Sequence, residues 1–423
     1  MLTLIAPQNL YNSTIKLSGS KSIHNRLLIL NEVLNLKLQF ENVSNSEDTK
    51  LLKKALQKIS TSNNAIIDVG HAGTDMRFLT AFLSIRKGEW VLTGSDRMKQ
   101  RPIGELVKVL TKIGADIHYI EKENYPPLKI KGNFLNGKSI EIDGSISSQF
   151  ISALLLISPV LKNGLELTIK NKPVSWPYVK MSIDLLTKAG IKVVTENNKI
   201  KISAISENFI SNIYNSKFFI ESDWSSASYW YSLVALSQDL EICLTGLKNN
   251  STQADSILPG IYSQFGVSTQ FKNDCIIIKK NGLCRFEFEY NFSDCPDIAQ
   301  TVAVTCFGLG MNAYLNGLST LKHKESDRIY ATKTELEKFG ALIETTDNSL
   351  ILKNSLVNNN IETLKTKTFT VSTYNDHRVA MSFAPLAILC KELCIQNPEV
   401  VSKSYPLFWE DLKSVGFNVN LTR

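Results

Sequence analysis

The sequence predicts an α/β protein of two domains, built from six repeats of one unit that has two helices and several strands. At five places an apolar run at helical spacing closes on a glycine and passes directly into an alternating apolar segment. The copies recur at a nearly constant spacing, at Gly114, Gly190, Gly266, Gly340 and Gly416. A fixed period marks a repeated supersecondary unit, and glycine is typical of the position just after a helix. The length of 423 residues is also too great for one ordinary core and suits two domains.

The first unit departs from this pattern. Residues 51–60 have the helical spacing, but Ser60 stands where the other units have glycine, and Gly114 follows it after less than a full period. Each later unit also has an earlier apolar run at helical spacing, such as 150–156, and strand-like alternation, such as 139–143. Counting the first unit gives six repeats, three for each domain.

Composition is that of a globular enzyme, with 43% apolar and 21% charged residues. No apolar run is long enough to span a membrane, and the first residues lack the pattern of a signal peptide. The seven cysteines all follow residue 242 and show no CxxC spacing, so we expect a reduced, cytoplasmic chain without disulfides or a zinc site.

The formal charge of +7 is compatible with an anionic partner. Nucleic-acid binding usually requires a basic run interleaved with aromatic residues, whereas the lysines here are scattered. We therefore expect a small, highly charged substrate, no nucleic acid and no membrane partner. Since no heptad pattern or long exposed apolar stripe is evident, a monomer is the default expectation.

Polar and charged residues recur at two fixed offsets before the closing residues, where the two helices of each unit should begin. The later helix starts carry Asp48, Arg101, Ser175 with Tyr178, Glu325 with Arg328, and Lys403. The earlier helix starts carry Lys21 with Ser22, Gly73 and Arg77, Ser147 with Ser148 and Gln149, Ser225 with Ser226, Asp297, and His377 with Arg378.

Helix N-termini present unpaired N–H groups and a partial positive charge, so cations there are unfavourable unless an anion is near. Serines alone are explained equally well as ordinary helix caps, but the repeated Arg and Lys residues are not. We therefore predict one anion-binding surface formed by these ends. The unit that closes at Gly266 has no cation at either offset, and we expect it to be structural or peripheral.

Five segments carry a resemblance to a known family. They are 19–26 (GSKSIHNR), 97–104 (RMKQRPIG), 143–150 (DGSISSQF), 322–329 (KHKESDRI) and 374–381 (YNDHRVAM). In this order, and over the whole chain, the set resembles the 5-enolpyruvylshikimate-3-phosphate (EPSP) synthase family.

The resemblance implies two inside-out α/β domains of three repeats each, made of residues 20–221 and of residues 1–19 plus 222–423, with the active site in the cleft between them. It also implies transfer of the enolpyruvyl (1-carboxyvinyl) group of phosphoenolpyruvate to the 5-hydroxyl of shikimate 3-phosphate. The reaction is an addition–elimination that releases phosphate and serves aromatic amino acid biosynthesis. No metal and no organic cofactor are implied.

The resemblance further assigns roles to individual residues. Asp297 resembles the base for the 5-hydroxyl, and Glu325 the acid that protonates the methylene carbon of phosphoenolpyruvate. His377 transfers a proton, orients Arg378 or donates one hydrogen bond. The implied contacts of shikimate 3-phosphate are Lys21, Ser22, Arg26, Ser147, Ser148, Gln149, Ser175, Asp297 and Lys324. Those of phosphoenolpyruvate are Lys21, Gly73, Arg101, Gln149, Arg328, Arg378 and Lys403, and Lys21 is also counted as catalytic.

The chain departs from the family pattern at several positions. His71 replaces the usual asparagine before Ala-Gly-Thr, and Phe78 replaces the proline of Met-Arg-Pro. Both lie near Gly73 in sequence, so the family pattern does not decide whether this chain is sensitive to glyphosate. Trp224 stands where a small residue is usual, and Thr320 where some members have a substrate-binding asparagine.

Three other functions fit the sequence less well. The related enolpyruvyl transferase that acts on UDP-N-acetylglucosamine relies on a cysteine in its N-terminal half, and this chain has none before Cys243. An RNA-binding or RNA-end-processing relative would bind with a steep salt dependence, but scattered lysines and the paired carboxylates Asp297 and Glu325 argue against it. An inactive scaffold is disfavoured because Lys21, Asp297, Glu325 and Arg378 are all retained.

Overall fold

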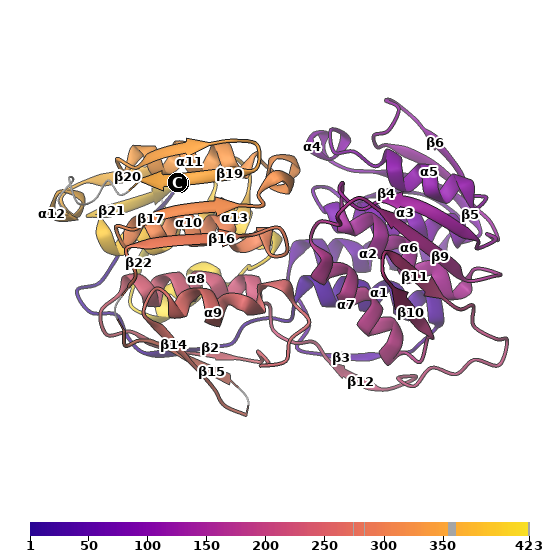
Figure 1. Ribbon diagram of the computed structural model, residues 1–423, viewed down its shortest axis with the longest axis horizontal. Helices are drawn as coiled ribbons and strands as arrows, with labels where there is room; N and C mark the ends of the chain where they lie inside the picture. Colours follow the sequence, from indigo (N-terminus) through magenta and orange to yellow (C-terminus); the bar gives the residue numbers. More distant parts are fainter. Residues whose placement is uncertain (274, 283, 354–360, 422–423) are drawn as a thin grey trace. The chain divides into compact units, whose positions relative to one another are not determined.

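The computed structural model describes residues 1–273, 275–282, 284–353 and 361–421 (Figure 1). The chain divides into two compact units, one of residues Ser20–Ile220 and one of Met1–Gly19 with Glu221–Arg423.

The repeat is clearest in the sheet β4–β5–β7–β6 of the Ser20–Ile220 unit. Strands β4 (Asn64–Asp68) and β5 (Gly88–Thr93) are parallel, and helix α3 (Gly73–Ile85) makes the crossover that parallel strands require. Helix α5 (Gly104–Lys112) then leads into a hairpin of β6 (Asp116–Tyr119) and β7 (Leu128–Gly132), in which β7 pairs antiparallel with both β5 and β6.

The same order recurs in the second sheet of this unit, β8–β9–β11–β10. Its elements are β8 (Ser139–Asp143), α6 (Ser148–Ile157), β9 (Leu165–Lys170), α7 (Trp176–Lys188), β10 (Val193–Glu196) and β11 (Lys199–Ile202). The degenerate first repeat lacks the hairpin within the described residues. It consists of α1 (Lys21–Leu34), β3 (Gln39–Glu41) and α2 (Glu47–Thr61), with β12 (Lys217–Phe219) parallel to β3.

The other unit has three four-stranded sheets within the described residues. The first sheet consists of β2 (Ser13–Ile15), β13 (Glu241–Thr245), β14 (Val267–Phe271) and β15 (Cys275–Lys280), and the helices of its repeat are α8 (Trp224–Leu236) and α9 (Leu258–Ser263). The second consists of β16 (Glu287–Asn291), β17 (Asn312–Asn316), β18 (Leu342–Thr345) and β19 (Ser349–Lys353), and the helices of its repeat are α10 (Ala299–Gly308) and α11 (Arg328–Lys338).

The third sheet is completed by the start of the chain. Three of its strands are β20 (Thr368–Val371), β21 (Glu392–Ile395) and β22 (Asn418–Leu421), and the helices of this repeat are α13 (His377–Phe383) and α14 (Phe408–Ser414). Strand β1 (Leu2–Ile5) lies antiparallel between β21 and β22, in the position that the hairpin strand takes elsewhere. The remaining short elements are α4 (Asp96–Lys99), α12 (Ile361–Lys365), and the 3₁₀ turns η1 (Ser158–Val160), η2 (Ala254–Ile257), η3 (Pro296–Ile298), η4 (Ser319–His323), η5 (Ala384–Leu389) and η6 (Pro398–Lys403).

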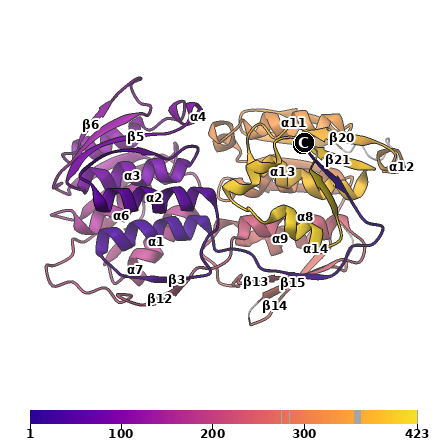
Figure 2. The same cartoon turned by 180° about the vertical axis from the view of Figure 1, so that it is seen from behind.

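Each unit places its helices inside and its sheets outside (Figures 1 and 2). Helix α10 is buried along its whole length, and α6 at all but one residue, as expected of helices that are apolar on all sides. Strands such as β7 and β8 instead alternate between buried and exposed residues, because one face of each sheet meets the helices and the other meets solvent. The predicted fold class is confirmed.

The closing glycines end their helices as the repeat predicts. Gly114, Gly190, Gly266, Gly340 and Gly416 all have positive φ, between 78° and 105°. Glycine adopts this left-handed backbone without the steric cost of a Cβ, so the chain can turn sharply from helix to strand. Ser60 lies inside α2 instead, and that helix ends at Thr61 with an extended cap at Ser62.

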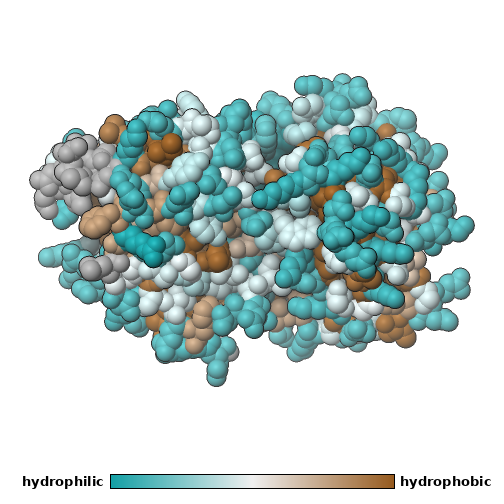
Figure 3. Space-filling view, viewed as in Figure 1, coloured by the Kyte–Doolittle hydropathy of each residue, from teal (hydrophilic) through white to brown (hydrophobic). Residues whose placement is uncertain are grey.

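The molecular face drawn in Figure 3 is mostly hydrophilic, with hydrophobic residues in separate groups. Within the described residues, no helix has both the length and the apolar character needed to span a membrane.

Candidate active site

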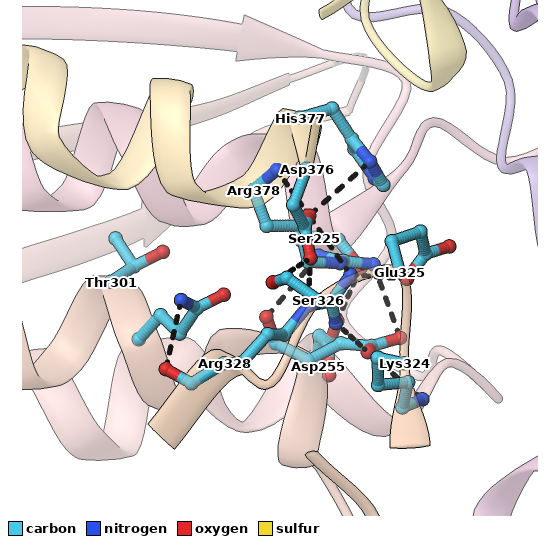
Figure 4. A network of polar contacts seen from close by, with 12 residues as sticks. Ser225, Asp255, Thr301, Lys324, Glu325, Ser326, Arg328, Asp376, His377 and Arg378 are labelled. Carbon is cyan, nitrogen blue, oxygen red and sulfur yellow. Dashed lines mark hydrogen bonds and ion pairs between the residues drawn. The ribbon is translucent and has the colours of Figure 1, made fainter. Parts of the chain in front are cut away.

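The helix starts of all three repeats in the Glu221–Arg423 part of the chain meet in one polar network (Figure 4). Asp297 lies in η3 just before α10, and Lys324 and Glu325 lie between η4 and α11. Arg328 begins α11, and His377 and Arg378 begin α13. Residues far apart in sequence are therefore brought together because each follows the first or second strand of its own repeat.

Asp297 is surrounded by cations. Its Oδ1 lies 3.3 Å from Lys324 Nζ and 3.1 Å from Arg328 Nη1, and its Oδ2 lies 3.1 Å from Arg378 Nη2. Burial alone would raise the pKa of the Asp297 carboxyl, but the charges of Arg378, Lys324 and Arg328 outweigh burial and hold the pKa well below its ordinary value of 3.8. Asp297 is therefore ionised and firmly held in this state.

Glu325 contacts one cation close to it in sequence and one from the following repeat. Its Oε2 lies 2.8 Å from Arg328 Nη2, and its Oε1 lies 2.8 Å from Lys403 Nζ at the end of η6. Lys324, the other neighbour in sequence, makes its ion pair with Asp297. The two sequence neighbours thus pair with groups from different elements, Lys324 with η3 and Glu325 with α11 and η6.

Arg328 joins three carboxylates. Besides Asp297 and Glu325, it donates from Nε to Asp376 Oδ2 at 2.8 Å and from Nη2 to Asp376 Oδ1 at 3.2 Å. Burial would lower the pKa of Arg328, but Asp376 and Glu325 raise it above its ordinary value. Asp376 also accepts from the backbone N–H of Arg378 at 3.0 Å and so caps α13. This carboxylate was missed by the sequence reasoning, although it immediately precedes His377.

His377 is buried, and its Nδ1 lies 3.6 Å from Asp376 Oδ1. It is adjacent to Arg378 at the start of α13. Its expected roles, proton transfer, orientation of Arg378 or donation of one hydrogen bond, stay predictions.

Ser225 and Asp255 extend the network into the repeat that closes at Gly266. Arg378 Nη2 donates to Ser225 Oγ at 3.4 Å, and Ser225 donates to Asp255 Oδ2. Burial and the neighbouring charge of Asp297 raise the pKa of Asp255 to about 7. This repeat contributes a serine and an acid, rather than a cation, to the network. The expectation that it is structural or peripheral stays a prediction. Asp255 could have been found from its position close to the expected helix start, but not from its charge.

The Ser20–Ile220 unit gathers helix starts of its own. Lys21 is the first residue of α1, and its Nζ lies 2.9 Å from Oδ2 of Asp48, in the first turn of α2. Gln149 Nε2 donates to Thr74 Oγ1 at 3.3 Å, which joins the starts of α6 and α3. These contacts place Lys21 with Asp48, and Gln149 with Thr74, at the same ends of packed helices.

Gly73 and Arg101 are in close contact. Both are buried, and a Cβ added at Gly73 would lie 2.6 Å from Arg101 Nη2. Glycine is therefore required for the guanidinium to occupy this position at the start of α3. The next helix, α5, starts at Gly104, two residues after Pro102.

Arg26 is buried beneath these helix starts. It donates from Nε to Ser182 Oγ at 2.8 Å, from Nη1 to the Ser22 carbonyl at 2.8 Å, and from Nη2 to Ser152 Oγ and the Tyr178 carbonyl, each at 3.1 Å. All four acceptors are neutral, and burial lowers the pKa of Arg26 to about 10. An anion bound nearby would compensate a charge that forms no ion pair with a carboxylate of the described chain.

The predicted serines lie at helix starts. Ser147 caps α6 by accepting from Gln149 N at 3.2 Å, and Ser148 follows as the first helical residue. Ser175 is the N-cap of α7, with a left-handed φ of 53° that a non-glycine residue adopts only when its surroundings hold it there.

The departures from the family pattern have identifiable surroundings. His71 Nδ1 lies 2.9 Å from Ser95 Oγ, at the turn before α3. The guanidinium of Arg26 lies over the Phe78 ring at 5.3 Å, so the phenylalanine supports a cation. Trp224 is buried and donates from Nε1 to Glu221 Oε1 at 2.9 Å. Thr320 Oγ1 is buried without a hydrogen-bond partner among the described residues.

Among the residues that the structure describes, no three His, Cys, Asp or Glu side chains are grouped as metal ligands would be. The chemistry of the described side chains is that of two carboxylates, Asp297 and Glu325, set among cations and helix N-termini.

Repeats with central helices and charged helix starts define the class of the protein as an enolpyruvyl transferase fold. The structure of the enolpyruvyl transferase NikO from Streptomyces tendae aligns with a TM-score of 0.75 at 14% identity, covering 100% of this chain and 98% of NikO. EPSP synthase from Acinetobacter baumannii aligns with a TM-score of 0.76 at 20% identity, covering 99% of this chain and 100% of that one.

Sequence relatives narrow the class to one family. The model of the family EPSP synthase (3-phosphoshikimate 1-carboxyvinyltransferase) matches residues 53–412. A 3-phosphoshikimate 1-carboxyvinyltransferase of Bacteroides fragilis is 41% identical over 423 residues, covering 100% of this chain and 99% of the relative. That of Buchnera aphidicola is 36% identical over 442 residues, covering 99% of this chain and 98% of the relative. The chain belongs to the EPSP synthase family.

Proposed function

We propose that this chain transfers the enolpyruvyl group of phosphoenolpyruvate to the 5-hydroxyl of shikimate 3-phosphate and releases phosphate. One observation within the network carries the chemistry. The single guanidinium of Arg328 contacts Asp297 through Nη1 at 3.1 Å and Glu325 through Nη2 at 2.8 Å. A base and an acid are thereby held on the two arms of one rigid, planar group.

Asp297 is the base in this proposal. It takes the proton of the 5-hydroxyl while the oxygen forms its bond to C2 of phosphoenolpyruvate, and positioned bases of this kind contribute about 10²–10⁴-fold. Without substrates, the surrounding cations depress the pKa of Asp297 and make it a weak base. Phosphate and carboxylate groups of the substrates would share Arg378 and Lys324, so the pKa of Asp297 rises when the site is loaded.

Glu325 is the acid. It gives a proton to C3 of phosphoenolpyruvate as C2 is attacked, which forms a tetrahedral adduct. It then takes a proton back from C3 while the C2–O bond to phosphate breaks, so the double bond returns and phosphate leaves. Its contact with Lys403 at 2.8 Å holds the carboxyl in place during both steps.

The other residues bind anions in this proposal. Lys21, Gly73, Arg101, Gln149, Arg328, Arg378 and Lys403 contact phosphoenolpyruvate. Lys21, Ser22, Arg26, Ser147, Ser148, Gln149, Ser175 and Lys324 contact shikimate 3-phosphate. These residues belong to both units, and we propose that the active site forms between them in a chain that acts as a monomer.

Phosphate release from phosphoenolpyruvate tests the function directly. We expect release with shikimate 3-phosphate as acceptor, and only background release with UDP-N-acetylglucosamine or without an acceptor. Release with UDP-N-acetylglucosamine alone would assign the chain a different acceptor. Release with neither acceptor would refute the proposed activity.

A further inference from the structure

Asp255 is a buried acid that forms no ion pair within the described chain. The residue is 2% exposed, and none of the described Lys, Arg or His side chains lies within ion-pair distance of it. The Oδ2 of Asp255 accepts a hydrogen bond from the hydroxyl of Ser225, while its Oδ1 has no hydrogen-bond partner among the described residues. A buried carboxylate in these surroundings is costly, and a bound proton removes that cost.

The charged groups around Asp255 point to the same state. From the elements packed against it, Asp223 of the α8 cap, Asp297 of η3 and Arg378 of α13 act on its charge, and the thiol of Cys295 is close by. Two of the three charges are negative. The pKa of Asp255 is raised to about 7, first by burial and then by Asp297, while Arg378 acts in the opposite direction.

An ionised Asp255 would add a negative charge to this network. The cations Lys324, Arg328, Arg378 and Lys403 already contact carboxylates, those of Asp297, Glu325 and Asp376. A further negative charge near Arg378 disfavours phosphate-bearing ligands.

Ser225 connects Asp255 to the anion-binding groups. Its Oγ donates to Asp255 and accepts from Arg378 Nη2 at 3.4 Å, and the same Nη2 lies 3.1 Å from Asp297 Oδ2. One serine therefore separates the acid from the guanidinium that holds the proposed base (Figure 4).

We propose that Asp255 is a positioning residue that carries a proton in the working enzyme, so that Arg378 remains available to Asp297 and to an incoming anionic substrate. Loss of that proton draws Arg378 toward Asp255 by charge attraction and weakens the binding of phosphoenolpyruvate. This proposal rests on the proposed function, because phosphoenolpyruvate is the anion whose binding it describes.

The test compares kcat and the KM for phosphoenolpyruvate between pH 6 and 9, at saturating shikimate 3-phosphate, in three variants. Asp255→Asn keeps the shape of the side chain but is neutral at every pH. We expect its KM to match the unsubstituted enzyme within about twofold at pH 6 and to be about tenfold lower at pH 8.5, with kcat little changed, because one buried charge has been removed. The exposed Asp239→Asn is the control and should follow the unsubstituted enzyme throughout.

Ser225→Ala gives a second readout. Its hydroxyl favours the ionised form of Asp255, so its loss should move the rise in KM to higher pH. Parallel KM profiles for Asp255→Asn and the unsubstituted enzyme would overturn the proposal, as would a profile of Ser225→Ala that is unmoved or shifted to lower pH. If Asp255→Asn does not fold, the Ser225→Ala profile decides alone. An unsubstituted enzyme that releases no phosphate from phosphoenolpyruvate in the presence of shikimate 3-phosphate would refute the proposed function instead. The two failures are therefore distinguishable.

Discussion

Arg378 holds Asp297 at two points: Nη2 lies 3.1 Å from the carboxylate Oδ2, and Nη1 donates to the Asp297 backbone carbonyl at 3.2 Å. The side chain and the main chain of the proposed base are thus fixed by one planar group. Such two-point recognition depends on the fork of the guanidinium, which a lysine ammonium does not reproduce.

Replacing Arg378 by lysine should keep the charge and lose this geometry. We expect kcat/KM for phosphoenolpyruvate to fall about 10²–10³-fold, comparable to removal of one preorganised donor. Steady-state kinetics measure the effect. The exposed Arg285→Lys on the same unit is the control and should leave the kinetics unchanged. Full activity of Arg378→Lys would mean that charge alone suffices.

Glu325→Gln should separate binding from turnover. The amide keeps the size of the side chain, and its one oxygen can still accept from either Arg328 or Lys403, but it cannot give a proton to carbon. We expect kcat to fall about 10²–10⁴-fold, while calorimetry shows shikimate 3-phosphate binding within a few-fold of normal. Glu337→Gln, an exposed change on the same helix α11, is the control. Unchanged turnover would remove Glu325 from the mechanism.

Gly73→Ala should act through Arg101. The added Cβ would lie 2.6 Å from Arg101 Nη2, so the guanidinium has to move. Displacements of this size cost up to about 10²-fold, and we expect most of that cost in the KM for phosphoenolpyruvate. Gly260→Ala is a matched control, because its added Cβ meets only Ile257 Cδ1 at 3.9 Å. An equal, small effect of both changes would show that Arg101 does not bind this substrate.

Asp297→Asn should destabilise the protein in a pH-dependent way. The pKa of Asp297 is lowered in the folded state, so its ion pairs contribute stability above the unfolded value of about 3.8, and this contribution is lost as the pH falls through the lower, folded value. Removing one partner of such a cluster costs about 3–5 kcal/mol.

We therefore expect Asp297→Asn to melt several degrees below the unsubstituted protein at pH 7, and this difference to shrink only below about pH 4. Thermal denaturation followed by circular dichroism measures it. The exposed Asp294→Asn should melt with the unsubstituted protein. A constant difference at all pH values would show that the ion pairs are not its cause.

Much of the fold was predictable from the sequence because its signals are local. A closing glycine and an apolar run at helical spacing depend on a few neighbouring residues, and all five glycines lie where the period placed them. The helix starts at Lys21, Ser148 and His377 were predictable for the same reason, since unpaired N–H groups select polar residues over a single turn.

The pairing of charges was not predictable in this way. Lys324 and Glu325 are neighbours in sequence, yet one joins Asp297 and the other joins Lys403, which belongs to the following repeat. Asp255 was not predicted, because the prediction relied on cations at the helix starts. Its raised pKa results from burial and from the nearby charge of Asp297. Likewise, only the paired strands show that β1 completes the last sheet and that β12 pairs with β3 of the first repeat.

The sequence by itself therefore determined the repeat, the helix starts and the family, since these depend on residue type and spacing along the chain. The tertiary structure decided which cation neutralises which carboxylate and which acid lacks an ion pair within the described chain. The physical reason is that Coulomb energies and desolvation depend on distance and burial in space, and the packing of the three repeats sets both.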